Sequence, residues 1–186
     1  RISTGDDALA IRAGHAWNQM DRICEIRDLV VSNCILESAC QGIRVGCTCD
    51  DLIRDCRFSN LIIRSRNVGI YLDNPKRYLT VACPGNLHEV DNISFDHISI
   101  ESGTKPFAVE VDPDVKLRRI GRICFRAIEF TGRHPLTFAG SAATPLEEIV
   151  LSDVSGTITE GETALVHRHV RRLVCDRTDI RLGGSR

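Results

Sequence analysis

Short runs of alternating hydrophobic and polar residues, separated by glycine, asparagine, aspartate and proline, recur along the chain. The apolar side chains of each run follow one spacing, with offsets of 0, 2, 5 and 7 from the first. Six copies can be aligned, and they begin at residues 29, 51, 93, 123, 149 and 173. Alternation of this kind is typical of β-strands, whereas the period of an amphipathic helix is poorly represented. The pattern therefore predicts an all-β protein.

A second series of shorter alternating runs alternates with these copies along the chain. These runs cover residues 9–12, 42–46, 69–73, 107–111, 136–140 and 164–167. Two strands per repeat, with repeats of about 22 to 42 residues, predict a solenoid of stacked coils. A β-sandwich also has many short strands, but it does not need one spacing to recur six times.

Stacking in a solenoid places like residues over like residues. On the alignment above, Cys34 and Cys56 occupy equivalent inward positions of successive coils. The longest repeat, from 51 to 93, has room for a loop between Asp73 and Val90. Loops that leave one side of a solenoid commonly build its binding face.

Composition limits the classes of function. The 186 residues, 42% of them hydrophobic, are enough for one domain with a substantial core. The formal net charge of -1 argues against nucleic acid as a partner, and the sequence has no run of 18 apolar residues that would cross a membrane. We expect residues 1–186 to form a single, monomeric β-helix domain. Because the sequence begins without methionine, we also expect it to be the C-terminal part of a longer protein.

The nine cysteines are an odd number and cannot all pair within one chain. Cys47 and Cys49 are the one closely spaced pair, and no histidine pair with zinc-finger spacing accompanies them. Several cysteines fall on core positions of the repeat, where the residue acts as a small hydrophobe. We therefore expect mostly free thiols, no metal and no cofactor.

Candidate chemistry lies near the start of the chain, where Asp6 and Asp7 stand between Gly5 and the first short run. Adjacent side chains of a regular strand point to opposite faces, so both carboxylates can face one cleft only if the backbone turns there. Gly5 permits such a turn. Paired carboxylates are the machinery of glycoside hydrolysis. Gly-Asp-Asp is also ordinary turn chemistry, and that interpretation remains open.

Residues 5–14, Gly-Asp-Asp-Ala-Leu-Ala-Ile-Arg-Ala-Gly, resemble the Gly-Asp-Asp-x-Ile-Ala-Ile-Lys-Ser-Gly signature of glycoside hydrolase family 28. This family contains polygalacturonases and rhamnogalacturonan hydrolases. Residues 41–46 are similar in position to the family's Gly-His-Gly segment, and residues 68–73 to its Gly-x-Arg-Ile-Lys segment. The resemblance covers nearly the whole chain as a repeat pattern and is strongest at residues 5–14.

The resemblance implies a right-handed parallel β-helix, a single-stranded solenoid like that of pectin lyases. It also implies a polysaccharide or oligosaccharide substrate and hydrolysis with inversion at the anomeric carbon. Asp6 would be the general acid. Asp7, with a further aspartate upstream of Arg1, would hold and deprotonate the attacking water. The family is usually secreted, but many free thiols also fit a reducing interior, so the sequence leaves the location open.

Three positions depart from the family motif. Gln41 stands where the family has its active-site histidine, Tyr71 where it has arginine, and Asp73 where it has lysine. In the family the cationic pair helps to hold a substrate carboxylate, which tyrosine and aspartate would not do. We therefore expect neutral or differently substituted sugars, bound by these three residues. Arg12 and Arg44 follow the second strand series and are further candidates for substrate binding.

Two alternatives come from other classes of protein. The same departures at Gln41, Tyr71 and Asp73 suit a non-catalytic carbohydrate-binding or structural β-helix module. A polysaccharide lyase would require a calcium site. The acidic pair that could supply its ligands, Asp50 and Asp51, is interpreted as a turn.

Two weaker features complete the survey. His15 and Trp17 follow the signature and could border a groove. The basic residues between 116 and 122 are interpreted as a solvated face.

Overall fold

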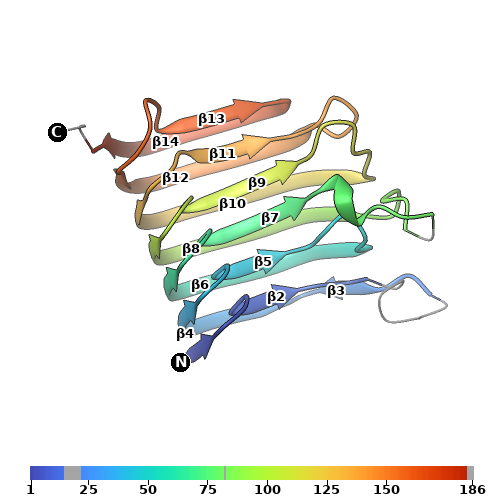
Figure 1. The fold of residues 1–186 in the computed structure, drawn as a ribbon, viewed down its shortest axis with the longest axis horizontal. Helices are drawn as coiled ribbons and strands as arrows, with labels where there is room; N and C mark the ends of the chain where they lie inside the picture. The colour runs from blue at the N-terminus through green and yellow to red at the C-terminus, as the bar shows by residue number, and fades with distance from the viewer. Residues whose placement is uncertain (15–21, 82, 184–186) are drawn as a thin grey trace.

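The structure, a computed structural model, describes residues 1–14, 22–81 and 83–183. The chain folds into a parallel β-helix whose coils stack along one axis, with the two termini at opposite ends of the stack (Figure 1). The predicted all-β solenoid is confirmed. The one helical element among the described residues is a 3-10 turn, η1 (Lys76–Tyr78). No helix of the described residues is long and apolar enough to span a membrane.

Two all-parallel sheets face each other across the core. Within the described residues, the first sheet contains eight strands, in spatial order β1 (Ile2–Thr4), β4 (Val30–Ser38), β6 (Leu52–Ser65), β8 (Glu89–Ser102), β10 (Arg119–Gly132), β12 (Leu146–Ile158) and β14 (Val170–Leu182), with β3 (Glu25–Arg27) also beside β6. The second contains six: β2 (Leu9–Ile11), β5 (Ile43–Val45), β7 (Ile70–Asn74), β9 (Phe107–Val111), β11 (Leu136–Ala139) and β13 (Leu165–Arg168). Each coil between β4 and β13 thus contributes one long and one short strand.

Each long strand has a residue with a left-handed backbone conformation at the same place in its repeat, and this shared bend explains the repeat spacing; β6 and β8 each have a second such residue, Asp55 and Asn92. The bend residues have φ between 46° and 58° and are Asn33, Asn60, His97, Ala127, Asp153 and Arg177. Each lies at offset 4 of its copy. In an unbroken strand the inward side chains would continue at offsets 4 and 6. The left-handed residue shifts that alternation by one position, so the core side chains resume at 5 and 7.

Stacked bends also contact one another. The side-chain amide of Asn60 donates a hydrogen bond to the side-chain oxygen of Asn33, one coil earlier, at 2.6 Å. Asparagine tolerates the left-handed conformation better than most residues, so both its backbone and its side chain suit this position.

The register of β4 against β6 corrects one predicted copy. Leu36 pairs with Ile63, so the second copy begins at Cys56 and not at Asp51. The prediction was wrong by five residues because β6 begins well before its bend and its first part also alternates. The true repeat runs from 56 to 93, and the excursion between β7 and β8 accounts for its length.

The same register overturns the predicted equivalence of two cysteines. Cys34 pairs with Leu61, whereas Cys56 pairs with Ile93 of the following coil. Cys56 is fully buried, as expected of a core position, but Cys34 is only partly buried.

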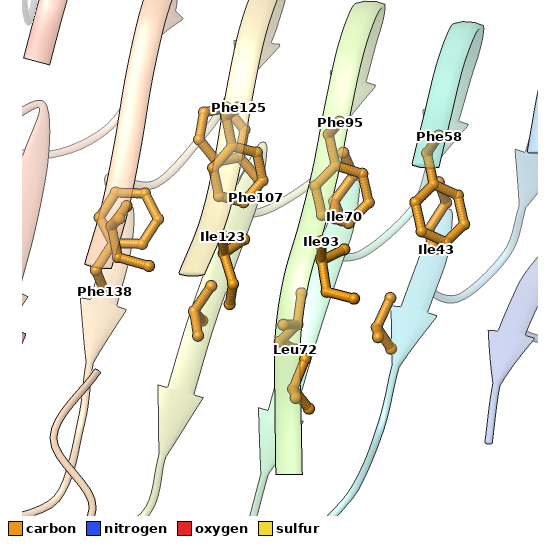
Figure 2. Close-up of a cluster of buried hydrophobic side chains, with 14 of the residues drawn as sticks. Ile43, Phe58, Ile70, Leu72, Ile93, Phe95, Phe107, Ile123, Phe125 and Phe138 are labelled. Atoms are coloured by element: carbon orange, nitrogen blue, oxygen red, sulfur yellow. The ribbon is translucent and has the colours of Figure 1, made fainter. Parts of the chain in front are cut away.

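Stacked aromatic rings form the centre of the core (Figure 2). Phe58, Phe95 and Phe125 lie on successive long strands, with ring centroids 4.9 and 5.2 Å apart. Phe107 reaches from the second sheet to stack on Phe125 at 4.4 Å, and Phe138 packs beside both. All five rings are fully buried, and each contributes about 1.5–3 kcal/mol through burial. The core is thus a continuous column of side chains that runs through the stacked coils.

Candidate functional site

Asp6 and Asp7 lie in the corner between β1 and β2, where the chain passes from the first sheet to the second. The hydroxyl of Ser38 donates to the main-chain oxygen of Asp6 at 2.7 Å, which fixes the corner to the next coil. The N–H of Asp7 donates to the carboxylate of Asp6 at 2.8 Å. Carboxylate oxygens of the two residues come within 4.8 Å of each other. The backbone turn that a shared cleft requires is therefore present.

Asp7 is the better anchored of the two carboxylates. Its Oδ1 accepts a hydrogen bond from the main-chain N–H of Gln41 at 3.1 Å, and its Oδ2 lies 3.9 Å from the guanidinium of Arg44. Asp6, by contrast, is exposed to solvent. One carboxylate is thus held by the scaffold, and the other is free to meet a ligand.

Arg44, on β5, connects Asp7 to Asp73 on β7. Its Nη2 lies 3.3 Å from Oδ2 of Asp73, which Arg77 also approaches at 3.6 Å. Burial raises the pKa of Asp73, and the two arginines oppose that effect. Asp73 therefore neutralises the charge of Arg44. A ligand that reaches Asp73 contacts an ion-pair network and not an isolated carboxylate.

Tyr71 is half-buried on β7, and its hydroxyl lies close to the carboxylates of Glu110 and Asp73. Burial raises the pKa of this phenol strongly, and the two neighbouring carboxylates add to the effect. The hydroxyl accordingly stays protonated over the physiological range. Lys105 pairs with Glu110 at 2.8 Å and closes this side of the network.

Gln41 connects two coils through its side chain as well as its main chain. Its Oε1 accepts a hydrogen bond from the N–H of Val68 at 3.3 Å. The residue at the family's histidine position thus has a structural contact, and it lies beside Asp7 as the resemblance implies.

Arg12 is paired with a buried carboxylate, Asp50, and its own side chain is 32% exposed. Its Nε donates to Asp50 Oδ2 at 2.8 Å. Asp50 closes a turn, as predicted, because its N–H donates to the main-chain oxygen of Cys47 at 2.9 Å; Asp50 and Asp51 are only 2% and 1% exposed. Asp51 accepts a hydrogen bond from the N–H of Cys24 at 2.7 Å, and the arginine compensates part of the cost of burying Asp50. Burial raises the pKa of Asp50, against the hydrogen bond from Arg12.

A cavity of about 130 Å³ lies between these groups and is lined by Arg12, Arg44, Cys47 and Tyr78. The ring of Tyr78 faces two cations, with Arg77 at 4.8 Å and Arg44 at 5.9 Å from its centroid. The sequence analysis missed Tyr78. Its signal was present, since it is an aromatic residue next to two cations in the longest loop.

Asp6, Asp7 and Cys40 are the described residues whose potential metal-ligand atoms gather within 4.8 Å of one another. Cysteine binds metals as the thiolate. Burial raises the pKa of the Cys40 thiol, and a hydrogen bond to Asp7 raises it further. Two carboxylates and one thiol thus gather beside the corner between β1 and β2.

The remaining candidates lie apart from this cluster. His15 and Trp17 fall outside the described residues. The basic residues near 118 lie on an exposed face, as predicted, and there Arg119 pairs with Asp91 at 2.6 Å and with Glu147 at 2.7 Å. They are part of an ion-pair network between neighbouring coils.

Comparison with models of protein families, with curated proteins and with solved structures found no match to this chain.

Proposed function

We propose that this chain is a glycoside hydrolase of the polygalacturonase-like type, with Asp6 and Asp7 at its active site. The observation that carries the proposal is the corner between β1 and β2, which brings one exposed and one anchored carboxylate together. Glycosidases need two carboxyl groups in different environments, because one must donate a proton while the other stays ionised. The resemblance at residues 5–14 supports the same assignment.

The exposed Asp6 donates its proton to the glycosidic oxygen as the bond breaks. Asp7 holds the attacking water, and the N–H of Gln41 and the guanidinium of Arg44 orient its carboxylate. The separation of the two side chains limits what the pair can do alone. Acid and base of an inverting enzyme are about 6.5–9.5 Å apart, more than the 4.8 Å found here. Inversion therefore requires a further carboxylate for the water, which the resemblance to the family supplies upstream of Arg1.

Sugars with few charges fit the surroundings of the pair best. Arg44 is already neutralised by two carboxylates, and Asp73 is paired with two arginines. Tyr71 and Glu110 offer a donor and an acceptor that suit sugar hydroxyls. The ring of Tyr78 lines the adjacent cavity and provides an apolar face for stacking.

Reducing-end release from a panel of polysaccharides tests the proposal. The panel contains galactan, arabinan, rhamnogalacturonan and homogalacturonan, and it is run with the natural protein and with Asp6→Asn and Asp7→Asn. We expect one of the first three to be cleaved best, with a loss of about 100-fold or more in each variant. Asp179→Asn, which changes an exposed carboxylate on β14, is the matched control and keeps full activity. Equal activity of the two active-site variants and the natural protein would overturn the proposal.

A second candidate function, a non-catalytic carbohydrate-binding module, is favoured by one observation. The side chain of Gln41 is engaged by Val68, so it cannot act as the histidine of the family does. Binding of an oligosaccharide measured by calorimetry, with no reducing ends released from any member of the panel, is the result that supports this alternative.

A further inference from the structure

Two buried cysteines meet where the long loop of the widest repeat folds back on the preceding coil. Cys49 lies in the turn after β5, and Cys83 lies in the loop between β7 and β8; they are 3% and 5% exposed. The Sγ of Cys49 lies 3.9 Å from the main-chain oxygen of Cys83, and the Cys49 side chain is near enough to contribute to the raised pKa of the Cys83 thiol. All nine cysteines of the structure are free thiols.

The backbone on both sides of this contact is held by hydrogen bonds. The turn that carries Cys49 is closed by the N–H of Asp50, which donates to the oxygen of Cys47 at 2.9 Å. Thr80 and Cys83 form an antiparallel bridge with N–H to O distances of 3.1 and 3.0 Å. A disulfide needs two cysteines whose Cβ atoms are held near each other, and the backbone of both segments is fixed by these hydrogen bonds.

The other cysteines on strands lie opposite different residues in the paired register. Cys34 pairs with Leu61, Cys56 with Ile93, and Cys175 with Leu151. Cys124 lies between Ser94 and Val150. In the described strand pairs no cysteine faces another, which leaves the contact between turn and loop as the site where two thiols converge.

We propose that Cys49 and Cys83 are an oxidisable pair that forms a disulfide and ties loop 75–88 to the turn at residues 47–50. The oxidant is a small-molecule disulfide. Its sulfur is attacked by one of the two thiolates, which releases the first external thiol and leaves a mixed disulfide. The second cysteine then attacks the mixed disulfide and releases the second external thiol. Two S–H bonds are replaced by one S–S bond, and two electrons and two protons pass to the external disulfide.

This bond fixes one wall of the cavity near Asp7. Cys49 Sγ also donates to the main-chain oxygen of Tyr78, whose ring lines that cavity. Oxidation consumes this S–H and replaces its hydrogen bond with a covalent link between the loop and the turn, whereas reduction leaves the loop attached only by hydrogen bonds and packing. The inference stands whether or not the protein cleaves sugars.

We expect thiol–disulfide exchange at Cys49 and Cys83 to be slow while loop 75–88 stays packed on the turn. Burial raises the pKa of both thiols, to about 12 for Cys83, and the attacking species is the thiolate. We expect the rate of oxidation to rise about tenfold per pH unit between pH 7 and 9, since the thiolate fraction rises by that factor.

Peptide mapping without reduction tests the proposal. The reduced chain is incubated with glutathione disulfide, its remaining thiols are alkylated, and it is cut with trypsin. Cleavage after Arg44 and Arg54 isolates peptide 45–54, which contains Cys49, and cleavage after Arg77 and Lys116 isolates peptide 78–116, which contains Cys83, because trypsin does not cut between Lys105 and Pro106. We expect the two peptides to be joined, with the mass of two hydrogens lost, and separated again by dithiothreitol.

Two matched variants identify the sulfur, because peptide 45–54 also contains Cys47. Cys47→Ser keeps the cross-link, and Cys49→Ser abolishes it. The oxidised natural protein melts roughly 5–10 °C higher than the reduced form, since the link closes a loop of the unfolded chain. The proposal is overturned if the natural protein yields both peptides alkylated separately, or if the link persists in Cys49→Ser. It is also overturned if each cysteine keeps a glutathione adduct. If Cys49→Ser does not fold, the peptide maps of the natural protein and of Cys47→Ser decide whether the disulfide forms.

Discussion

The main-chain N–H of Gln41 donates a hydrogen bond to the carboxylate of Asp7 across 3.1 Å, from one coil to the coil before it. The side chain of Asp7 therefore has a structural contact in addition to its proposed part in catalysis. A variant that removes both properties cannot tell them apart.

Asp7→Asn and Asp7→Ala separate the two roles. Asparagine keeps a side-chain oxygen that can accept from Gln41, so we expect the free energy of unfolding to change little. Alanine leaves the half-buried N–H without its partner and costs about 1–2 kcal/mol. Urea denaturation measures both. If Asp7→Asn destabilises the fold as much as Asp7→Ala does, the carboxylate charge, and not the hydrogen bond, holds the corner.

Ala127 occupies the left-handed bend of β10, with φ of 50°. A Cβ in this conformation costs roughly 1–2 kcal/mol, so Ala127→Gly is expected to stabilise the protein by about 1 kcal/mol. Ala108→Gly, in the middle of β9, is the control, and it should destabilise by about 0.5–1 kcal/mol. Thermal melting of the two variants gives shifts of opposite sign. A lower melting temperature for both would contradict the explanation of the bend.

Phe95 lies between Phe58 and Phe125 in the column of stacked rings shown in Figure 2. Phe95→Ala leaves a cavity at the centre of the core and is expected to cost about 3–5 kcal/mol. Val81→Ala serves as the control, because Val81 is fully exposed and its loss should change stability by less than about 0.5 kcal/mol. Chemical denaturation compares them, and similar midpoints for the two variants would contradict the core described above.

His88 is fully buried, and neither ring nitrogen has a hydrogen-bond partner among the described residues. Burial lowers the pKa of His88 to about 4, with Arg12 adding to the effect and Asp51 opposing it. The unfolded chain binds this proton with a pKa near 6.5, so the protein loses stability as the pH falls from about 6.5 through 4. The full loss is about 3 kcal/mol.

Urea denaturation of the natural protein and of His88→Gln at pH 7, 5 and 4 tests this pH dependence. The variant should lose less stability on acidification. The raised pKa values of Asp50 and Asp73 act in the opposite direction, because their contribution is present below pH 4 and is lost as the pH rises. Those carboxyl groups remain in both proteins, so parallel pH profiles would show that His88 does not titrate in this range.

The spacing of apolar residues was sufficient to predict the solenoid and both of its strand series. Alternation is a local property of an extended backbone, so it identifies the side chains that face inward without knowledge of the rest of the fold. The spacing of apolar residues also contains a sign of the bend, because the step from offset 2 to offset 5 is the shift that one left-handed residue causes. The position of Asp6 and Asp7 in a turn before a strand was likewise readable from the sequence.

Tertiary structure decided the register and the partners of the charges. The copy predicted at Asp51 begins at Cys56, because stacking against the neighbouring coils selects one of two alternating stretches in β6. The ion pair of Arg44 with Asp73 joins two coils, and so does the contact between Cys49 and Cys83. The burial of Asp50 also results from the stacking of coils. Hydrophobic alternation along a strand depends on neighbours in the sequence, whereas these contacts depend on which coil lies above which, and only the stacked molecule fixes that order.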